Sequence, residues 1–154
     1  MADTFPNPVT FRLNGEELTV PAGTTIWQAA RDQGLTLPHL CHRPASGYRP
    51  DGNCRACMVE VEGERALVAS CIRKVEDGMV VHTRSRRAEQ SRRLVMELLL
   101  ADQPPREQAH DRFSQLWKMS ELIGVTTSRF PALEPDRVPP LDASHVAMRV
   151  NLDA

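Results

Sequence analysis

The placement of its four cysteines limits what this chain can fold into more than any other feature. Cys41, Cys54, Cys57 and Cys71 are its only thiols, and they follow the spacing C-x12-C-x2-C-x13-C. Glycines and prolines interrupt residues 35–56 repeatedly, which predicts an irregular loop. Three cysteines therefore belong to one loop or its exit, while Cys71 comes from the end of a later strand. This pattern indicates that the four thiols act together.

A group of thiolates with one distant partner is typical of the [2Fe-2S] sites of ferredoxins, although the first gap here is longer than in the plant-type spacing. Ferric iron bridged by sulfide needs soft anionic ligands, and four thiolates supply two for each iron. We expect the tight turn at Arg55-Ala56 to aim backbone N–H groups at the sulfurs, and Gly52 to let the backbone approach them. The candidate ligands of the cluster and its metal are Cys41, Cys54, Cys57 and Cys71.

Three other uses of the cysteines stay open. Structural zinc also accepts four thiolates, but such sites usually pair two C-x2-C elements, and this chain has one. A thioredoxin-like C-x-x-C motif begins a helix, whereas the residues after Cys57 alternate as a strand does. Four unrelated buried thiols would not explain why a loop rich in Gly and Pro holds three of them. The spacing favours iron–sulfur over zinc, and we expect His39 and His42 to be neighbours of the site rather than ligands.

Composition excludes several other classes of protein. The 154 residues carry a net charge of -1, so no global field attracts nucleic acid or an anionic membrane. The first residues lack the basic and apolar regions of a secretory signal, and no apolar run is long enough to span a bilayer. No Gly-rich phosphate-binding motif indicates nucleotide binding, and no catalytic constellation stands out. We therefore expect a cytoplasmic protein with reduced cysteines and no catalytic residues of its own.

The first part of the chain has the pattern of a small mixed sheet over one helix. Alternating apolar residues and the hairpin dipeptide Asn14-Gly15 predict two strands within residues 9–20. A short helix follows, capped by Thr24 or Thr25 with Gln28 nearby, and ended at Gly34. Three further strands are predicted within residues 58–61, 65–71 and 78–83. These elements indicate an α+β fold of β-grasp type for residues 1–83.

The rest of the chain predicts helices and then a tail. Residues 84–103 contain neither Gly nor Pro and are rich in helix-forming residues, so we expect a helix that ends at Pro104-Pro105. Phe113, Trp117 and their neighbours follow helical spacing up to Gly124. The expected organisation is thus a ferredoxin-like domain at 1–83, a two-helix extension at 84–124, and an extended tail or linker at 125–154.

Several stretches together resemble a known family. The segments LPHLCHRP, GNCRACMVEVEGERALVASC, GMVVHTRS and LVMELLLADQP are similar to the N-terminal [2Fe-2S] domain of the large iron–sulfur subunit of respiratory complex I. They resemble still more the α subunit of NAD-dependent formate dehydrogenases that contain molybdenum or tungsten. The similarity covers residues 9 to 104, and the ending DASHVAMRVNLDA also resembles that α subunit.

The resemblance implies a β-grasp ferredoxin fold in which the four cysteines bind one [2Fe-2S] cluster. It implies that the chain is the N-terminal piece of a longer oxidoreductase polypeptide, whose partners are other iron–sulfur, flavin and molybdopterin domains or subunits. Electrons from formate oxidation would then pass through this domain toward flavin and NAD. No cysteine follows Cys71, so His110 has no nearby thiolates with which to bind a cluster. We therefore expect no second cluster here. A free-standing ferredoxin and a zinc-stabilised interaction module are the alternatives.

The run RSRRAEQSRR at residues 84–93 carries five arginines and one glutamate. One interpretation is a docking face for an acidic partner subunit or redox partner. The other is an ordinary solvated helix face. The sequence does not separate them.

Overall fold

The structure is a computed structural model that describes residues 7–132 and 141–150. The parts of the predicted tail at 133–140 and 151–154 lie outside the described residues. None of the helices in the described ranges combines the length and the apolar composition needed to cross a bilayer.

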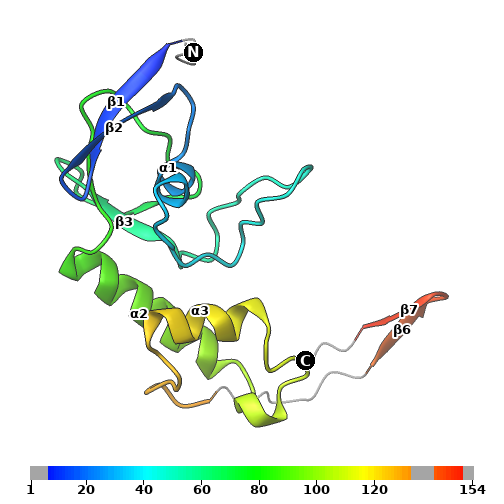
Figure 1. Cartoon of the computed structure of the whole chain (residues 1–154). Coiled ribbons are helices and arrows are strands. Elements are labelled where there is room, and N and C mark those ends of the chain that lie inside the picture. The colour runs from blue at the N-terminus through cyan, green and yellow to red at the C-terminus, as the bar shows by residue number, and fades with distance from the viewer. Residues whose placement is uncertain (1–6, 133–140, 151–154) are drawn as a thin grey trace.

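A five-stranded mixed sheet forms the first half of the molecule (Figure 1). Its spatial order is β2-β1-β5-β3-β4, with β1 and β5 running parallel and every other neighbouring pair antiparallel. The predicted mixed sheet with few helices is thereby confirmed. The strands are β1 (Pro8–Leu13), β2 (Glu16–Pro21), β3 (Met58–Val61), β4 (Val68–Ala69) and β5 (Val80–His82).

The predicted hairpin at the start of the chain is confirmed. Phe11 and Leu13 of β1 are buried, and the alternation that predicted the strand places them on the same face. Asn14 and Gly15 both have positive φ, at 53° and 92°, as a two-residue hairpin turn requires. The Asn14 side chain also accepts a hydrogen bond from the Thr83 backbone N–H at 2.8 Å. The turn is thus tied to the residue that follows β5, although the two are far apart in the sequence.

Helix α1 (Ile26–Asp32) packs against the sheet, and its predicted signals are confirmed. The Thr25 hydroxyl accepts from the Gln28 N–H at 3.2 Å, and the Gln28 side chain accepts from the Thr25 N–H at 2.9 Å. These reciprocal bonds form a capping box, which satisfies two backbone donors at the helix start. Gly34, with φ of 74°, follows the helix end. Ile26, Ala29 and Ala30 form the buried side of the helix, and Trp27 is buried as well.

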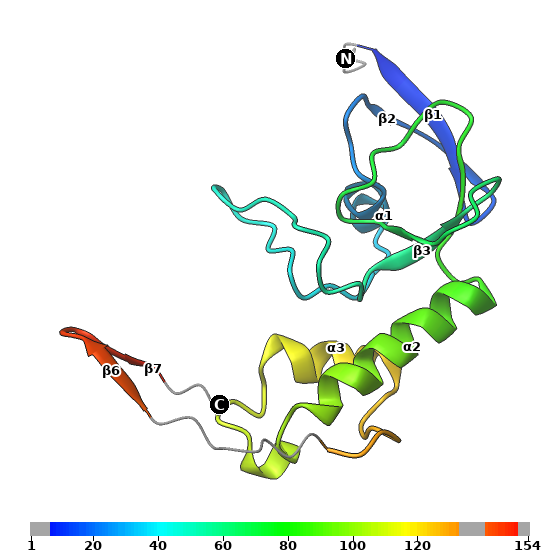
Figure 2. The ribbon, with the colours of Figure 1, turned by 180° about the vertical axis from the view of Figure 1, so that it is seen from behind.

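Beyond the sheet, α2 (Arg86–Ala101) and α3 (Gln115–Ile123) pack together (Figure 2). Both predicted helices are confirmed, and a short 3-10 helix, η1 (Arg106–Gln108), lies between them. Gly124 ends α3 in the left-handed region, as its position predicted. Phe113 differs from expectation: it precedes α3 and is 72% exposed, because the helix begins only after the Ser114 N-cap. A hydrophobic core separate from the one between α1 and the sheet consists of Met96, Leu100, Trp117, Met119 and Val125.

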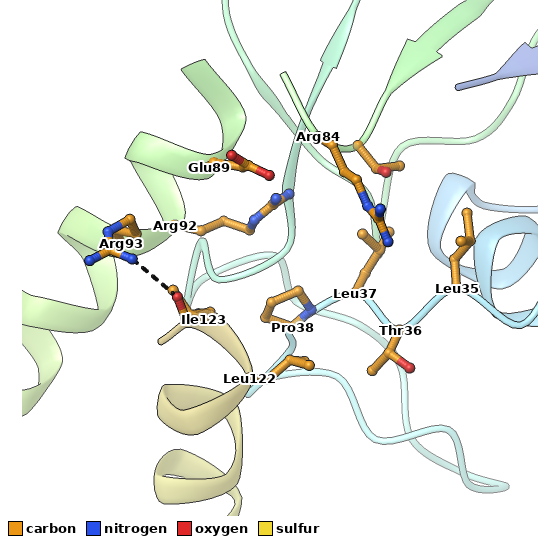
Figure 3. Close-up of a pocket in the computed structure, with 11 residues that line it drawn as sticks. Leu35, Thr36, Leu37, Pro38, Arg84, Glu89, Arg92, Arg93, Leu122 and Ile123 are labelled. Atoms are coloured by element: carbon orange, nitrogen blue, oxygen red, sulfur yellow. Dashed lines mark hydrogen bonds between the residues drawn. The ribbon is translucent and has the colours of Figure 1, made fainter. Parts of the chain in front are cut away.

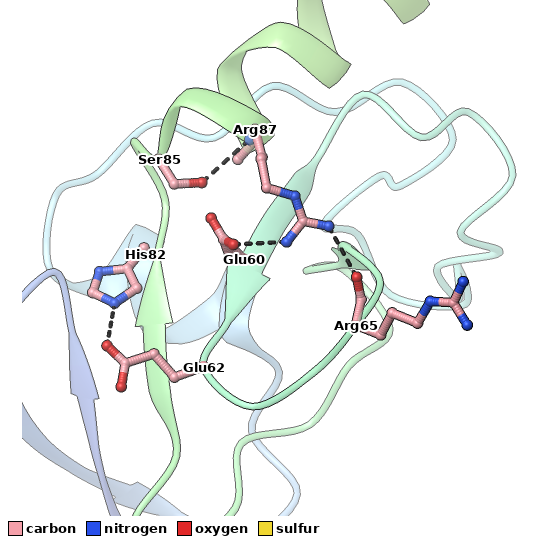
Figure 4. Close-up of polar contacts among 7 residues, drawn as sticks. Glu60, Glu62, Arg65, His82, Ser85 and Arg87 are labelled. Atoms are coloured by element: carbon pink, nitrogen blue, oxygen red, sulfur yellow. Dashed lines mark hydrogen bonds and ion pairs between the residues drawn. The ribbon is translucent and has the colours of Figure 1, made fainter.

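Two arginines of the basic run hold α2 against the sheet. Arg87 donates to the Glu60 carboxylate at 2.8 Å and to the Arg65 carbonyl at 2.9 Å (Figure 4). Arg92 is buried and donates to the Met58 carbonyl at 2.8 Å. The run is therefore neither a purely solvated face nor a purely external docking face. Part of it is internal structure.

The predicted extended tail is wrong for residues 142–150. Strands β6 (Asp142–His145) and β7 (Met148–Val150) form an antiparallel hairpin that projects from the body (Figures 1 and 2). All four residues of β6 are exposed, so no apolar alternation marked the strand in the sequence. Backbone pairing defines this element, and the Asp142 and His145 side chains accept hydrogen bonds from the Ser144 and Ala147 N–H groups.

The capping box at α1 gives a direct test of how this helix is stabilised. We expect Thr25→Ala to lower the free energy of unfolding by about 1 kcal/mol, because the Gln28 N–H loses its acceptor. Thr25→Ser keeps a hydroxyl and should retain most of the stability. Chemical denaturation of the cluster-loaded protein measures both. Equal destabilisation by the two substitutions would contradict the capping role.

Candidate metal centre

The pairing of β3 with β4 brings Cys57 and Cys71 together. Met58 lies opposite Ala69 in this antiparallel pair, and the Ser70 N–H donates to the Cys57 carbonyl at 3.2 Å. The two cysteines directly flank this short ladder, one before β3 and one after Ser70. Both are 1% exposed. Two thiols separated by 13 residues in the sequence thus meet in the interior.

Helix α1 fixes the segment that carries Cys71. Its first-turn N–H groups, which have no acceptor within the helix, bond to this segment instead. The Ile26 N–H donates to the Arg73 carbonyl at 2.9 Å, and the Trp27 N–H donates to the Ser70 carbonyl at 3.0 Å. The capping box stabilises the start of α1, and the backbone bonds from this first turn hold the segment that carries Cys71 in place.

Cys41 and Cys54 come from the long loop between α1 and β3, which extends from the body in Figure 1. Both are partly exposed. Burial opposes ionisation of Cys41, but N–H groups of residues 52–54 and the Cys54 thiol bond to its sulfur, and these bonds lower its pKa. These donors come from residues before the Arg55-Ala56 turn, which was expected to supply them. Burial raises the pKa of Cys54, against hydrogen bonds from the backbone of Cys41, Ala56 and Leu40.

The second pair of thiols is also hydrogen-bonded. The Cys71 thiol donates to the Cys57 sulfur, which lowers the pKa of Cys57 to about 6 despite its burial. The buried Ser70 side chain also lowers the pKa of Cys57. The pKa of Cys71 is raised, first because its proton is shared with Cys57 and then by burial. One thiol of this pair is thus readily ionised.

The four sulfurs therefore form two pairs, Cys41 with Cys54 and Cys57 with Cys71. The pairs are close enough for the charges of Cys41 and Cys54 to act on Cys71. Within the described residues, no group of three or more His, Cys, Asp or Glu side chains is arranged to hold one metal ion. Two adjacent pairs of soft donors, supplied with backbone N–H groups, fit two bridged irons better than a single zinc.

The two histidines beside Cys41 pack against Trp27. Their rings lie edge-on to the indole, with centroids 4.9 Å away for His39 and 4.6 Å for His42. The Nδ1 atom of His39 lies 3.1 Å from the Leu37 carbonyl. Burial lowers the pKa of His42, and the neighbouring charges of His39 and Arg31 lower it further. Both rings thus pack on Trp27 beside Cys41, and their role as neighbours of the site rather than ligands stays a prediction.

Two structural features explain why glycine occupies position 52. Its φ of 68° lies in the left-handed region, and an added Cβ would lie 2.8 Å from the Ile72 Cδ1 atom. The loop backbone thus passes close to the residue after Cys71, which brings the two halves of the site together. The group next to Gly52 is thus the Ile72 side chain, and the expected approach of this backbone to the cluster stays a prediction.

Sequence reasoning missed three residues of the site. Ser70, Trp27 and Arg92 are buried around the cysteines, yet none belongs to a spacing motif. Ser70 could have been suspected from its position beside Cys71. Arg92 could not, because its burial depends on how α2 docks on β3.

Comparison with known proteins decides the nature of the site. Residues 6–86, just over half of the chain, match the family described as "2Fe-2S iron-sulfur cluster binding domain". The chain belongs to this family. It therefore binds a [2Fe-2S] cluster, and the zinc-stabilised alternative is excluded. Since such a cluster exchanges electrons, the chain contains an electron-transfer domain.

Named relatives of this 2Fe-2S domain are parts of larger proteins. One subunit of the NADH-quinone oxidoreductase of Mycobacterium tuberculosis is 36% identical over 143 residues, which cover 90% of this chain and 18% of the relative. A subunit of the NADP-reducing hydrogenase of Solidesulfovibrio fructosivorans is 42% identical over 99 residues, or 62% of this chain and 17% of that protein. The chain thus spans less than a fifth of either relative.

A solved structure extends the similarity beyond the cluster domain. A chain of the NAD+-reducing [NiFe]-hydrogenase in the H2-reduced state matches with a TM-score of 0.74 and 31% identity. The match covers 90% of the present chain and 57% of the hydrogenase chain. The shared fold is therefore not limited to the residues that surround the cysteines.

Removal of the cluster should loosen the loop that carries Cys41 and Cys54. Residues 36–56 contain no helix or strand and few backbone hydrogen bonds, so we expect metal–thiolate bonds to hold much of their structure. We expect trypsin to cut after Arg55, the one arginine of this loop that is not followed by proline, many-fold faster in the iron-depleted protein than in the loaded one. Cleavage after Arg12, within β1, serves as the control and should change little. Equal loop cleavage in both forms would contradict this dependence.

Proposed function

We propose that the four cysteines are the cluster ligands, with Cys41 and Cys54 on one iron and Cys57 and Cys71 on the other. The observation that carries this proposal is that the β3–β4 ladder brings the buried Cys57 and Cys71 together, while Cys41 and Cys54 share the loop that leads to β3. Thiolates then fill every ligand position of both irons, so no position is left for a substrate. We propose accordingly that this chain relays electrons and performs no bond chemistry of its own.

The bound cluster supplies one-electron exchange between ferric and ferrous iron. The chain's residues control the surroundings of that exchange. Cys57 and Cys71 are shielded from water, whereas Cys41 and Cys54 are partly exposed. N–H groups of residues 52–54 bond to the Cys41 sulfur and stabilise its negative charge. The exposed side of the site is then the natural entry or exit for electrons, because partners can approach it most closely.

The domain would serve a larger NAD-linked oxidoreductase complex. Its relatives carry the names of NADH-quinone oxidoreductase and NADP-reducing hydrogenase subunits, and the matching structure is of an NAD+-reducing hydrogenase. Other iron–sulfur and flavin subunits would be its electron-transfer partners. A cytoplasmic location would suit this role.

A formate dehydrogenase with a molybdopterin centre is the more specific parent that we propose. Support comes from the resemblance of the cysteine-containing segments and of residues 142–154 to the α subunit of that enzyme. The helices after the domain would then form an extension between the cluster domain and downstream parts of the parent. The sheet order β2-β1-β5-β3-β4, with parallel central strands and α1 packed on the sheet, supports the β-grasp assignment.

The ligand assignment predicts the effect of single substitutions. Cys57→Ser should lose the visible absorbance of the cluster and most of its iron, because a soft thiolate is replaced by a hydroxyl. His42→Gln, beside Cys41, should retain both. Iron and sulfide analysis with absorption spectroscopy measures the effect. A full-intensity, unshifted spectrum from Cys57→Ser would remove that cysteine from the ligand set.

The parent activity can be tested in the native complex. We expect formate to reduce the cluster of the affinity-purified complex within the turnover time of NAD reduction, as measured by rapid-freeze electron paramagnetic resonance. Hydrogen and NADH serve as comparison donors. Rapid reduction by hydrogen and none by formate would reject the formate dehydrogenase assignment while leaving the relay role intact.

A further inference from the structure

Arg92 is a buried cation next to a proposed ligand. It lies in the middle of α2, and only 7% of its surface is exposed. Its Nη1 atom donates to the carbonyl of Met58 at 2.8 Å, and Met58 directly follows Cys57. The guanidinium therefore sits against the strand end that carries an almost fully buried sulfur.

The surroundings of Arg92 leave its charge incompletely balanced. It faces a pocket of about 340 Å³ between α2, α3 and the Leu35–Pro38 segment that leads to Cys41 (Figure 3). In the described part of the chain, no carboxylate lies within ion-pair distance of its guanidinium. Glu89, one helical turn earlier, attracts it at longer range, while Arg84 repels it.

Burial gives this charge a long electrostatic reach. Burial lowers the pKa of Arg92, and attraction by Glu89 and Cys57 acts in the opposite direction. The guanidinium nevertheless stays protonated at any ordinary pH. A charge in the protein interior acts on its neighbours far more strongly than one that water and salt can screen.

We propose that Arg92 raises the reduction potential of the cluster by stabilising the additional negative charge of the reduced state. This inference deepens the proposed function and rests on Cys57 being a ligand. The site gains negative charge when it accepts one electron from a donor, with no bond made or broken and no proton transferred at Arg92. A nearby buried cation therefore favours the reduced form over the oxidised one.

A purely structural role for Arg92 would be to fasten α2 to β3, as Arg87 does. The two arginines lie on the same helix and both bond to groups of the same sheet. They differ in exposure, because the Arg87 side chain is 53% exposed and paired with Glu60. This difference makes Arg87 a matched control (Figure 4). Loss of fastening alone would affect stability in both variants without a specific shift in potential.

The test is a mediated redox titration of the cluster-loaded full chain, followed by visible absorbance and electron paramagnetic resonance. For Arg92→Met, which keeps an unbranched apolar stem without the charge, we expect the ratio of reduced to oxidised cluster at a fixed potential to fall about tenfold. That change equals about 59 mV for a one-electron couple. Arg92→Lys should stay near wild type, and Arg87→Gln should change little because its charge is screened.

Glu89→Gln provides a variant with the opposite expected sign. Removal of this carboxylate unmasks the charge of Arg92, so the reduced fraction should rise, by less than Arg92→Met lowers it because Glu89 is exposed. This variant leaves the core intact, but the Glu89 carboxylate also acts on the cluster directly, so Arg92→Gln replaces Arg92→Met, with the same expected fall, if Arg92→Met does not fold. Potentials of Arg92→Met or Glu89→Gln equal to wild type, or an equal shift in Arg87→Gln, would overturn the proposal. Loss of the cluster in Cys57→Ser tests the ligand set separately, since Arg92 variants should keep the cluster.

Discussion

The short antiparallel pairing of β3 with β4 is the constraint on which the rest of the site depends. It holds the buried thiols of Cys57 and Cys71 side by side, and it leaves the β3 end exposed to the guanidinium of Arg92. The first turn of α1 reinforces it through backbone bonds to residues 70 and 73. Since each of these groups is buried, the protein itself positions this half of the cluster site.

In the other half of the site, the protein does not impose the geometry by burial. The loop that carries Cys41 and Cys54 has little regular structure, so its conformation follows from what its own thiols and N–H groups bind. A rigid, buried pair joined to an adaptable, partly exposed pair gives the site a protected side and an accessible side. That asymmetry suits an electron relay, in which one side must admit partners and the other must exclude water.

The basic run on α2 shows how one sequence pattern can serve several purposes. Arg87 forms exposed polar contacts, Arg92 carries a buried charge, and Arg84 and Arg86 remain exposed. Arg84 precedes the helix, and within it the helical period assigns Arg86, Arg87 and Arg92 to different faces. The tail illustrates the opposite limitation, because all four residues of β6 are exposed and the strand left no periodic signal.

The sequence by itself determined the local elements and the donor chemistry: the Asn14-Gly15 hairpin, the Thr25 capping box, the two longer helices and the four thiols proposed as ligands. These follow from short-range rules, in which a few neighbouring residues set the backbone angles or the donor type. Only the tertiary structure decided which thiols pair, that Ser70 and Arg92 are buried beside them, and that Phe113 is left outside. Those outcomes depend on contacts between segments far apart in the chain, and no local pattern encodes the way in which two surfaces meet.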